Sequence, residues 1–178
     1  MLKLIAGQYG GRKLVTPKGT ATRPTSARVR ESLFSMLGEL NGISVLDLFA
    51  GSGALGLEAL SRGAASAVFV ERDRAAAECV RQNIDTLAAE ARVLELDWKR
   101  AVSQLVSEGQ VFGLVFLDPP YGDASLIGPQ IAELITPILE PDARLVSESD
   151  ARDPIGIGLP VTRERRYGDT LLQFHEFE

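Results

Sequence analysis

The sequence contains very few of the residues that support disulfide, metal or histidine chemistry. Its 178 residues include one cysteine, Cys79, and one histidine, His175. A single cysteine excludes an internal disulfide, and without a Cys/His cluster no metal site is expected. We expect Cys79 to be an inert core thiol, and His175 to be a packed or surface imidazole rather than a catalytic group.

Long apolar runs are also missing. The apolar stretches are no longer than a strand, so no membrane span is expected, and residues 1–5 lack the features of a signal peptide. Together with the single cysteine, these absences make the cytoplasm the expected location. A hydrophobic content of 45% and a charged content of 24% are ordinary for one soluble domain over residues 1–178.

Net positive charge is found only at the N-terminal end. The net charge is −5, yet residues 1–36 carry +6 and the remainder carries −11. The overall acidity argues against indiscriminate nucleic-acid binding, whereas the asymmetry suggests that a polyanion docks at the basic end. The alternative is a charged N-terminal segment that is simply solvated.

One stretch, residues 43–56, organises the rest of the chain. Residues 43–48 are mostly apolar and predict a buried strand, and residues 54–60 predict a helix. Between them, Gly51 and Gly53 permit positive φ and a close approach of a ligand to the backbone. Such a strand, turn and helix place a ligand at the carboxyl end of a parallel sheet.

The three glycines Gly51, Gly53 and Gly56 also fit G-x-G-x-x-G, which is a weak dinucleotide motif by itself. Acidic residues follow or end four predicted strands, and they are Asp47, Glu71, Asp97 and Asp118. Carboxylates at one rim would repel the pyrophosphate of a dinucleotide and attract a cation. We therefore favour S-adenosylmethionine, which carries a sulfonium and an ammonium, over a nicotinamide dinucleotide or no cofactor.

The remaining patterns predict a doubly wound α/β sheet. From residue 43 onward, strand patterns alternate with helix patterns, which implies parallel strands with helices on both faces. A closing hairpin over 161–166 and 170–177 adds an antiparallel strand. The other predicted strands are 43–48, 67–71, 92–96, 111–118 and 143–147; the helices are 54–60, 74–87, 99–106 and 126–138.

Before the sheet, residues 2–6 and 12–16 predict a small hairpin with Arg12 and Lys13 near its tip. A Thr-, Pro- and Gly-rich loop over 16–26 leads to a helix over 27–40, capped by Thr25 or Ser26. Arg28 and Arg30 lie in its first turn, where the helix dipole disfavours cations. This placement hints that an anion compensates them, although Glu31 is an alternative.

Two of the acidic residues have distinct candidate roles. Glu71 follows Asp47 by a spacing typical of an acid that accepts hydrogen bonds from ribose hydroxyls. Asp97 could accept from the adenine amine with Trp98 beside the ring, or it could simply cap the helix that follows.

The segment Asp118-Pro119-Pro120-Tyr121 points most directly to a reaction. Two prolines stiffen it and leave carbonyl acceptors without N–H donors. Asp118 and the carbonyl of Pro119 could each accept an N–H of an exocyclic base amine, which frees the nitrogen lone pair to attack a methyl carbon. Tyr121 offers a flat face on which an extruded base can stack.

Together with the glycine turn, this motif resembles that of class I S-adenosylmethionine-dependent amino-methyltransferases. The segments IAGQYGGRKL, TRPTS, RVRE, DLFAGSG and RYGDT resemble the bacterial 16S ribosomal RNA guanine-N2 methyltransferase family, the RsmD group, over essentially the whole chain. Ala27 departs mildly from the family pattern. The resemblance implies a seven-stranded, Rossmann-like, mostly parallel methyltransferase sheet with an N-terminal hairpin extension.

The resemblance also implies methylation of the 2-amino group of a guanine in 16S rRNA, within the small ribosomal subunit or an assembly intermediate. Residues 1–26 would contact RNA and residues 27–178 would form the catalytic core of a protein expected to be a monomer. Catalytic roles are implied for Asp118, Pro119 and Tyr121. Cofactor contacts are implied for Asp47, Phe49, Ala50, Gly51, Gly53, Glu71, Arg72, Asp97 and Trp98. RNA phosphate contacts are implied for Arg12, Lys13, Arg23, Arg28 and Arg30.

Two other functions fit parts of the pattern. The same tetrapeptide serves amino-methylation of adenine or cytosine in DNA, although no separate target-recognition domain is evident. A catalytically silent RNA-binding assembly factor is a third possibility, against which the intact Asp118-to-Tyr121 motif argues.

Overall fold

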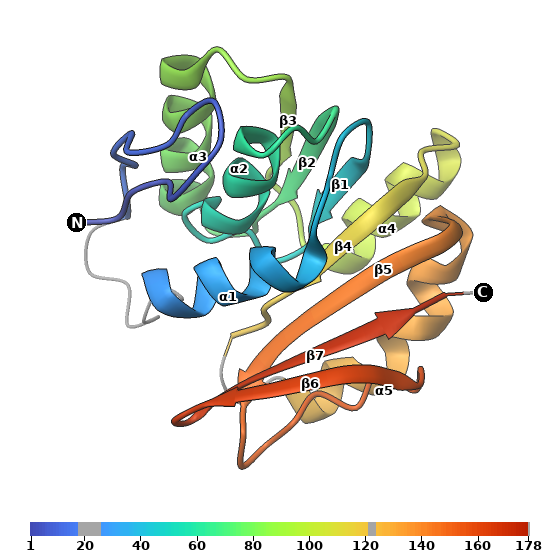
Figure 1. Cartoon of the computed structure of the whole chain (residues 1–178). Helices are drawn as coiled ribbons and strands as arrows, with labels where there is room; N and C mark the ends of the chain where they lie inside the picture. The colour runs from blue at the N-terminus through green and yellow to red at the C-terminus, as the bar shows by residue number, and fades with distance from the viewer. Residues whose placement is uncertain (18–25, 121–123, 178) are drawn as a thin grey trace.

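The computed structural model describes residues 1–17, 26–120 and 124–177, and its described strands form one mixed sheet (Figure 1). The strand order is β3-β2-β1-β4-β5-β7-β6. The first five strands in the chain run parallel, and β7 is antiparallel to both of its neighbours. The doubly wound α/β fold predicted from the sequence is confirmed. The strands are β1 (Ser44–Asp47), β2 (Ser66–Val70), β3 (Ala91–Leu94), β4 (Phe112–Leu117), β5 (Leu139–Asp150), β6 (Val161–Tyr167) and β7 (Thr170–Glu176).

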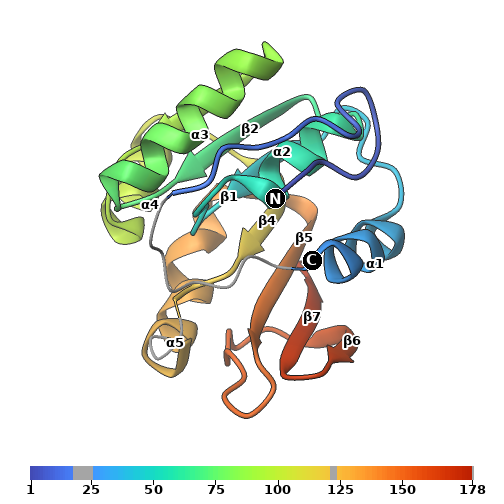
Figure 2. The ribbon, with the colours of Figure 1, turned by 90° about the vertical axis from the view of Figure 1, so that its left-hand side faces the viewer.

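Helices cover both faces of the sheet, as Figures 1 and 2 show. Residues of α1, α2 and α3 share one buried apolar cluster with one face, and residues of α4 and α5 share another with the opposite face. The helices are α1 (Ala27–Leu37), α2 (Ala54–Ser61), α3 (Arg74–Leu87), α4 (Trp98–Ser107) and α5 (Ala124–Ile135), followed by the 3-10 helix η1 (Thr136–Ile138).

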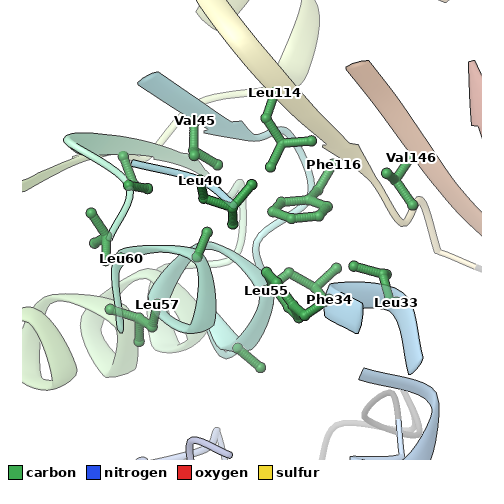
Figure 3. Close-up of a cluster of buried hydrophobic side chains, with 14 of the residues drawn as sticks. Leu33, Phe34, Leu40, Val45, Leu55, Leu57, Leu60, Leu114, Phe116 and Val146 are labelled. Atoms are coloured by element: carbon green, nitrogen blue, oxygen red, sulfur yellow. The ribbon is translucent and has the colours of Figure 1, made fainter. Parts of the chain in front are cut away.

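The central strands are apolar because both of their faces are buried. All six residues of β4 are buried, as expected for a strand in the middle of a parallel sheet. Figure 3 shows Phe34 of α1 and Leu55 of α2 pointing toward Phe116 of β4. The rings of Phe34 and Phe116 meet edge to face with centroids 5.8 Å apart. This contact fixes α1 over the centre of the sheet.

Two element boundaries differ from the prediction. Helix α1 ends at Leu37 rather than at residue 40 because Gly38 has a φ of 70° and leaves the helix. Strand β5 begins at Leu139 rather than at residue 143, and it passes through Pro141 and Asp142. The strand absorbs them in an irregularity, where the register against β4 shifts and Asp142 has a φ of 62°.

The N-terminal hairpin folds against α2 instead of forming two regular strands. One antiparallel bridge joins Lys3 and Lys13, so the predicted strands over 2–6 and 12–16 are reduced to a bridge. The buried carboxylate of Glu58 in α2 accepts from the backbone N–H groups of Ile5 at 2.7 Å and Ala6 at 3.1 Å. A hairpin this small needs such packing to persist.

No helix within the described residues is long and apolar enough to cross a membrane.

Replacing Gly56 with alanine should destabilise the fold. A Cβ at Gly56 would lie 2.4 Å from a ring carbon of Phe69, which is fully buried in β2. Overpacking of this kind costs about 1–3 kcal/mol. Urea unfolding should show that loss for Gly56→Ala and almost none for Gly156→Ala, where a Cβ meets nothing within 4 Å. Equal stability of both variants would contradict the close packing of α2 on β2.

Candidate active site

The candidate site lies where the strand order reverses. Strands β1 and β4 are neighbours in the sheet, although β2 and β3 separate them in the chain. The N–H of Leu48 donates to the carbonyl of Phe116 at 3.1 Å, so the two strands lie side by side up to their carboxyl ends. In open α/β sheets this reversal leaves a crevice in which ligands bind. The glycine turn follows β1 and Asp118 follows β4, so both lie at this switch point.

The glycine turn has the left-handed conformation that glycine favours. Gly51 has a φ of 54° and Gly53 a φ of 77°. A Cβ at Gly51 would meet nothing within 4 Å, so open space adjoins the backbone there. The N–H of Gly53 donates to the carbonyl of Ala50 at 2.7 Å, and that of Ala50 donates to Val70 at 2.9 Å, which ties the turn to β2.

Glu71 holds the glycine turn from the end of β2. One of its carboxylate oxygens accepts from the N–H of Gly51 and the other from the N–H of Asp73, each at 2.8 Å. A carboxylate has about four lone-pair sites, so these two bonds leave acceptor capacity for hydroxyl donors. The side chain is half-buried directly after β2. Glu71 is therefore fixed in position beside the turn.

Asp47 is buried under the turn. Its side chain is 2% exposed, and one oxygen accepts from the N–H of Gly56 at 3.0 Å. Burial raises the pKa of Asp47 from 3.8 to about 7; the Glu71 charge adds to this effect and the Gly56 bond opposes it. Its charge is costly in the free protein and would be favoured by a nearby cation.

Asp118 is half-buried directly after β4 and is followed by a buried Pro119. Burial raises the pKa of Asp118 well above its usual value, and the charges of Glu148 and Asp47 raise it further. The structure thus brings Asp118 into the same electrostatic environment as Asp47. Tyr121 lies outside the described residues.

Glu148 on β5 is an acidic residue of this rim that the sequence analysis missed. Phe116 pairs with Asp47 on one side and with Val146 on the other, so these three side chains point to the same face of the sheet. Side chains two residues apart along a strand share a face, so Asp118 and Glu148 also project from the face of Asp47. Glu148 is 7% exposed. It directly follows the predicted strand over 143–147, so the rule that selected the other strand-end carboxylates would have found it.

Asp97 caps α4, as one of its two predicted roles required. It is exposed, and its side chain accepts from the N–H of Lys99 at 3.0 Å. Trp98 is buried with its ring centroid 6.3 Å from that of Phe49. Both aromatic rings belong to the apolar cluster under α4. A contact of Asp97 or Trp98 with adenine stays a prediction, as does a contact of the exposed Arg72.

The predicted RNA-binding residues divide into exposed and buried side chains. Arg12, Lys13 and Arg28 are exposed, and Arg12 donates to the carbonyl of Thr86 at 3.3 Å. Arg23 lies outside the described residues.

The burial of Arg30 contradicts its predicted role in binding RNA phosphate. It is 1% exposed and donates to the carbonyl of Lys3 at 2.7 Å. Burial lowers the pKa of Arg30, while the charges of Glu58 and Glu148 act to raise it. Protein carboxylates therefore offset this cation in the first turn of α1, and Arg30 ties the N-terminal segment to α1.

These residues fit S-adenosylmethionine. The open space at Gly51 admits a ligand to bare backbone, and the carboxylates of Asp47, Glu71 and Asp118 suit its positive groups. A dinucleotide would set its pyrophosphate against the same carboxylates. When bound, S-adenosylmethionine supplies an electrophilic methyl group on a sulfonium.

The fold, the switch-point crevice and the acidic rim define a class I S-adenosylmethionine-dependent methyltransferase. The chain belongs to the family described as Conserved hypothetical protein 95, whose model matches residues 2–176.

Two curated relatives support this assignment. "Putative rRNA methyltransferase YlbH" of Bacillus subtilis (strain 168) is 41% identical over an alignment of 180 residues. The match covers 95% of this chain and 95% of that protein. Ribosomal RNA small subunit methyltransferase D of Escherichia coli (strain K12) is 47% identical over 122 residues, covering 67% of this chain and 60% of that protein.

Solved structures show the same fold. The Escherichia coli protein yhhF superposes with a TM-score of 0.84 at 36% identity, covering 99% of this chain and 98% of that one. An RNA methyltransferase from Salinibacter ruber, solved with S-adenosylhomocysteine, has a TM-score of 0.67 at 16% identity, covering 86% of this chain and 93% of that one. This more distant likeness shows the fold alone.

Asp47 should make stability depend on pH. Because its folded pKa of about 7 lies above its usual 3.8, the native state binds the extra proton between those values, and stability falls as pH rises from about 4 to about 7. Asp47→Asn should therefore gain stability over the wild type across this range, by up to roughly 4 kcal/mol at 1.36 kcal/mol per pH unit. Urea unfolding from pH 4 to pH 8 measures the difference, with Asp85→Asn, at an exposed position, as control. A pH-independent difference would contradict the buried charge.

Glu71→Ala should weaken cofactor binding before it affects anything else. The variant removes the acceptor proposed for ribose and releases the N–H of Gly51. Hydrogen bonds to charged groups contribute about 1.5–3 kcal/mol, so the dissociation constant of S-adenosylhomocysteine should rise at least tenfold in calorimetry. The control Glu95→Ala, which removes an exposed carboxylate paired with Arg81 at 2.9 Å, should leave it unchanged. An unaltered constant in Glu71→Ala would refute the assignment.

Proposed function

We propose that this chain transfers a methyl group from S-adenosylmethionine to the exocyclic N2 amine of a guanine in 16S rRNA. The observation that carries the proposal is the position of Asp118-Pro119-Pro120 at the end of β4, across the switch point from the glycine turn. The names of the Bacillus subtilis and Escherichia coli relatives support rRNA as the substrate. The resemblance of the motifs supports the N2 amine.

Asp118 and Pro119 suit an amine that is a poor nucleophile. The lone pair of an exocyclic base amine is delocalised into the ring. If the carboxylate of Asp118 and the carbonyl of Pro119 each accept one N–H, the nitrogen becomes more pyramidal and its lone pair is freed. The prolines at 119 and 120 have no N–H, so this segment presents acceptors only.

Asp118 is also suited to remove a proton. The amine proton becomes acidic as the new N–C bond forms, and Asp118 or a water molecule can accept it. A carboxylate whose pKa lies above its usual value is a better base than an exposed one. We nevertheless assign most of the rate to positioning, since reactants held in an aligned pair gain far more than a modest base provides.

The basic N-terminal segment would hold the RNA. The exposed Arg12, Lys13 and Arg28, together with Arg23, would contact phosphates and fix the register of the strand without reading its sequence. The target guanine must leave its stack to reach Asp118, at a cost of a few kcal/mol. With rRNA as substrate, we place the reaction in the cytoplasm, on the small subunit or an assembly intermediate, by a monomeric enzyme.

A label-transfer assay separates the candidate functions. Purified protein and radiolabelled S-adenosylmethionine are incubated with undermodified small subunits, naked 16S rRNA and DNA. The proposal predicts label on an rRNA guanine in at least one of the first two. Label on DNA adenine or cytosine would instead support a DNA amino-methyltransferase, and binding without label would support a silent assembly factor.

Asp118→Ala should lower turnover while leaving the affinity for S-adenosylhomocysteine, which lacks the sulfonium charge, nearly intact. Loss of an acceptor that acts on the attacking amine should reduce kcat by about 100-fold, the lower range for groups that act in the transition state. S-adenosylhomocysteine affinity should change less than about threefold. The kcat of Asp118→Asn should lie between those of the wild type and Asp118→Ala. The control Glu90→Gln removes an exposed carboxylate at the opposite edge of the sheet. Equal losses of affinity and turnover would contradict this division of roles.

A further inference from the structure

Strand β6 presents unusual positive charge at the edge of the sheet. It is the terminal strand in the order, and every residue from Val161 to Arg166 is exposed. Three of these residues are arginines, Arg163, Arg165 and Arg166, in a region of the chain that is otherwise acidic. The function proposed above assigns them no role.

Two of these arginines share one face. Arg163 pairs with Phe174 and Arg165 with Leu172 of β7, and both partners belong to the apolar cluster under α1. Arg163 and Arg165 therefore lie on the α1 side of the sheet. Neither forms an ion pair with another described residue. Within the described part of the chain, Arg165 donates only to the carbonyl of its neighbour Glu164, at 3.2 Å. Arg166 differs because its charge acts on Asp150, and it donates to the carbonyl of Gly168 at 2.8 Å.

The register places Arg165 level with the candidate acceptor site. Glu148 pairs with Leu172, and Leu172 pairs with Arg165. Asp118 lies one residue past the pair of Leu117 with Ser147, hence opposite Glu148. Three strand spacings of about 4.8 Å put Arg165 roughly 14 Å from Asp118 along this row. A nucleic-acid strand with one base at Asp118 can pass over Arg165 at that distance.

Helix α1 extends the positive surface. The hydroxyl of Ser32 is hydrogen-bonded to the hydroxyl of Tyr167, the last residue of β6. Arg28 lies one turn earlier on α1 and is exposed on the same side of the helix. Arg28 therefore lies near the carboxyl end of β6. Arg163 and Arg165 are named here the β6 strip, and Arg28, already assigned to phosphate above, lies beside it.

We infer that the β6 strip binds RNA phosphates on the side of the acceptor site opposite the N-terminal hairpin. The hairpin packs on α2, beside β1 and β2, whereas β6 ends the other half of the sheet (Figure 1). A strand with its extruded base at β4 is then held on both flanks. Charge complementarity with phosphate selects RNA as the occupant, and the inference rests on the function proposed above.

A competing explanation is that the arginines only protect an exposed edge strand from pairing with other chains. The two explanations differ in the salt dependence of RNA binding. Each phosphate contact on a single strand contributes about 0.7 to the slope of log Kd against log salt. Edge protection contributes nothing to it.

The test is the double variant Arg163→Ala/Arg165→Ala, with undermodified small subunits and naked 16S rRNA as probes. Filter binding across salt concentrations should show a slope lower by about 1.4 on both probes, with affinity at low salt about tenfold weaker. The KM for RNA should rise accordingly, while kcat and S-adenosylhomocysteine affinity stay within about twofold.

The matched control is Arg81→Ala/Arg92→Ala, which removes two partly exposed arginines paired with Glu95 and Glu108. It makes the same change in net charge and should leave the slope unchanged. Thermal unfolding of both variants checks the fold.

If the β6 double variant shows an unchanged slope and still methylates RNA, the strip does not bind phosphate, and the proposed function stands. Weaker binding to intact subunits alone, with no change on naked rRNA, would indicate a ribosomal protein contact and also overturn it. If the wild type methylates no RNA but binds it with a slope that the strip variant lowers, the proposed function is wrong, whereas phosphate binding by the strip is supported.

Discussion

The structure depends on carboxylates that the parallel sheet forces together at one edge. Asp47, Asp118 and Glu148 project from one face of three adjacent strands, and Glu71 joins them from β2. Like charges with little water between them repel strongly, and burial adds to the cost of ionising them. The raised pKa values of Asp47 and Asp118 are the result. A bound cation relieves this repulsion, which explains why the fold tolerates it.

Backbone contacts keep this edge in place without help from a ligand. Glu71 accepts from the glycine turn, and Asp47 accepts from the first half of α2. On the same face, Glu58 and Arg30 tie the N-terminal hairpin to α2 and α1 through backbone groups of residues 3–6. The proposed RNA-binding hairpin and the acidic edge therefore share one rigid support, so RNA held by the hairpin has a fixed position relative to Asp118.

The sequence predicted the elements whose own pattern decides their structure. Helix α3 has the predicted bounds because its apolar residues recur at helical spacing and Asp73 caps it. Strand β4 was equally easy to predict, because burial on both faces makes its sequence continuously apolar. The early end of α1 is set locally by Gly38, a C-cap glycine that the prediction passed over. The irregular start of β5 depends instead on its register against β4, which single residues do not reveal. Arg30 was predicted to bind phosphate because arginine is usually exposed, but tertiary packing buries it where it donates to the backbone of Lys3.

A crystal structure with S-adenosylhomocysteine would show whether this edge of the sheet binds the cofactor. We expect the ligand between the carboxyl ends of β1 and β4, with its ribose hydroxyls on Glu71, its amino acid portion along Gly51–Gly53, and the carboxylate of Asp118 facing its sulfur. A ligand bound elsewhere, or an Asp118 side chain that faces away from an occupied crevice, would contradict this expectation.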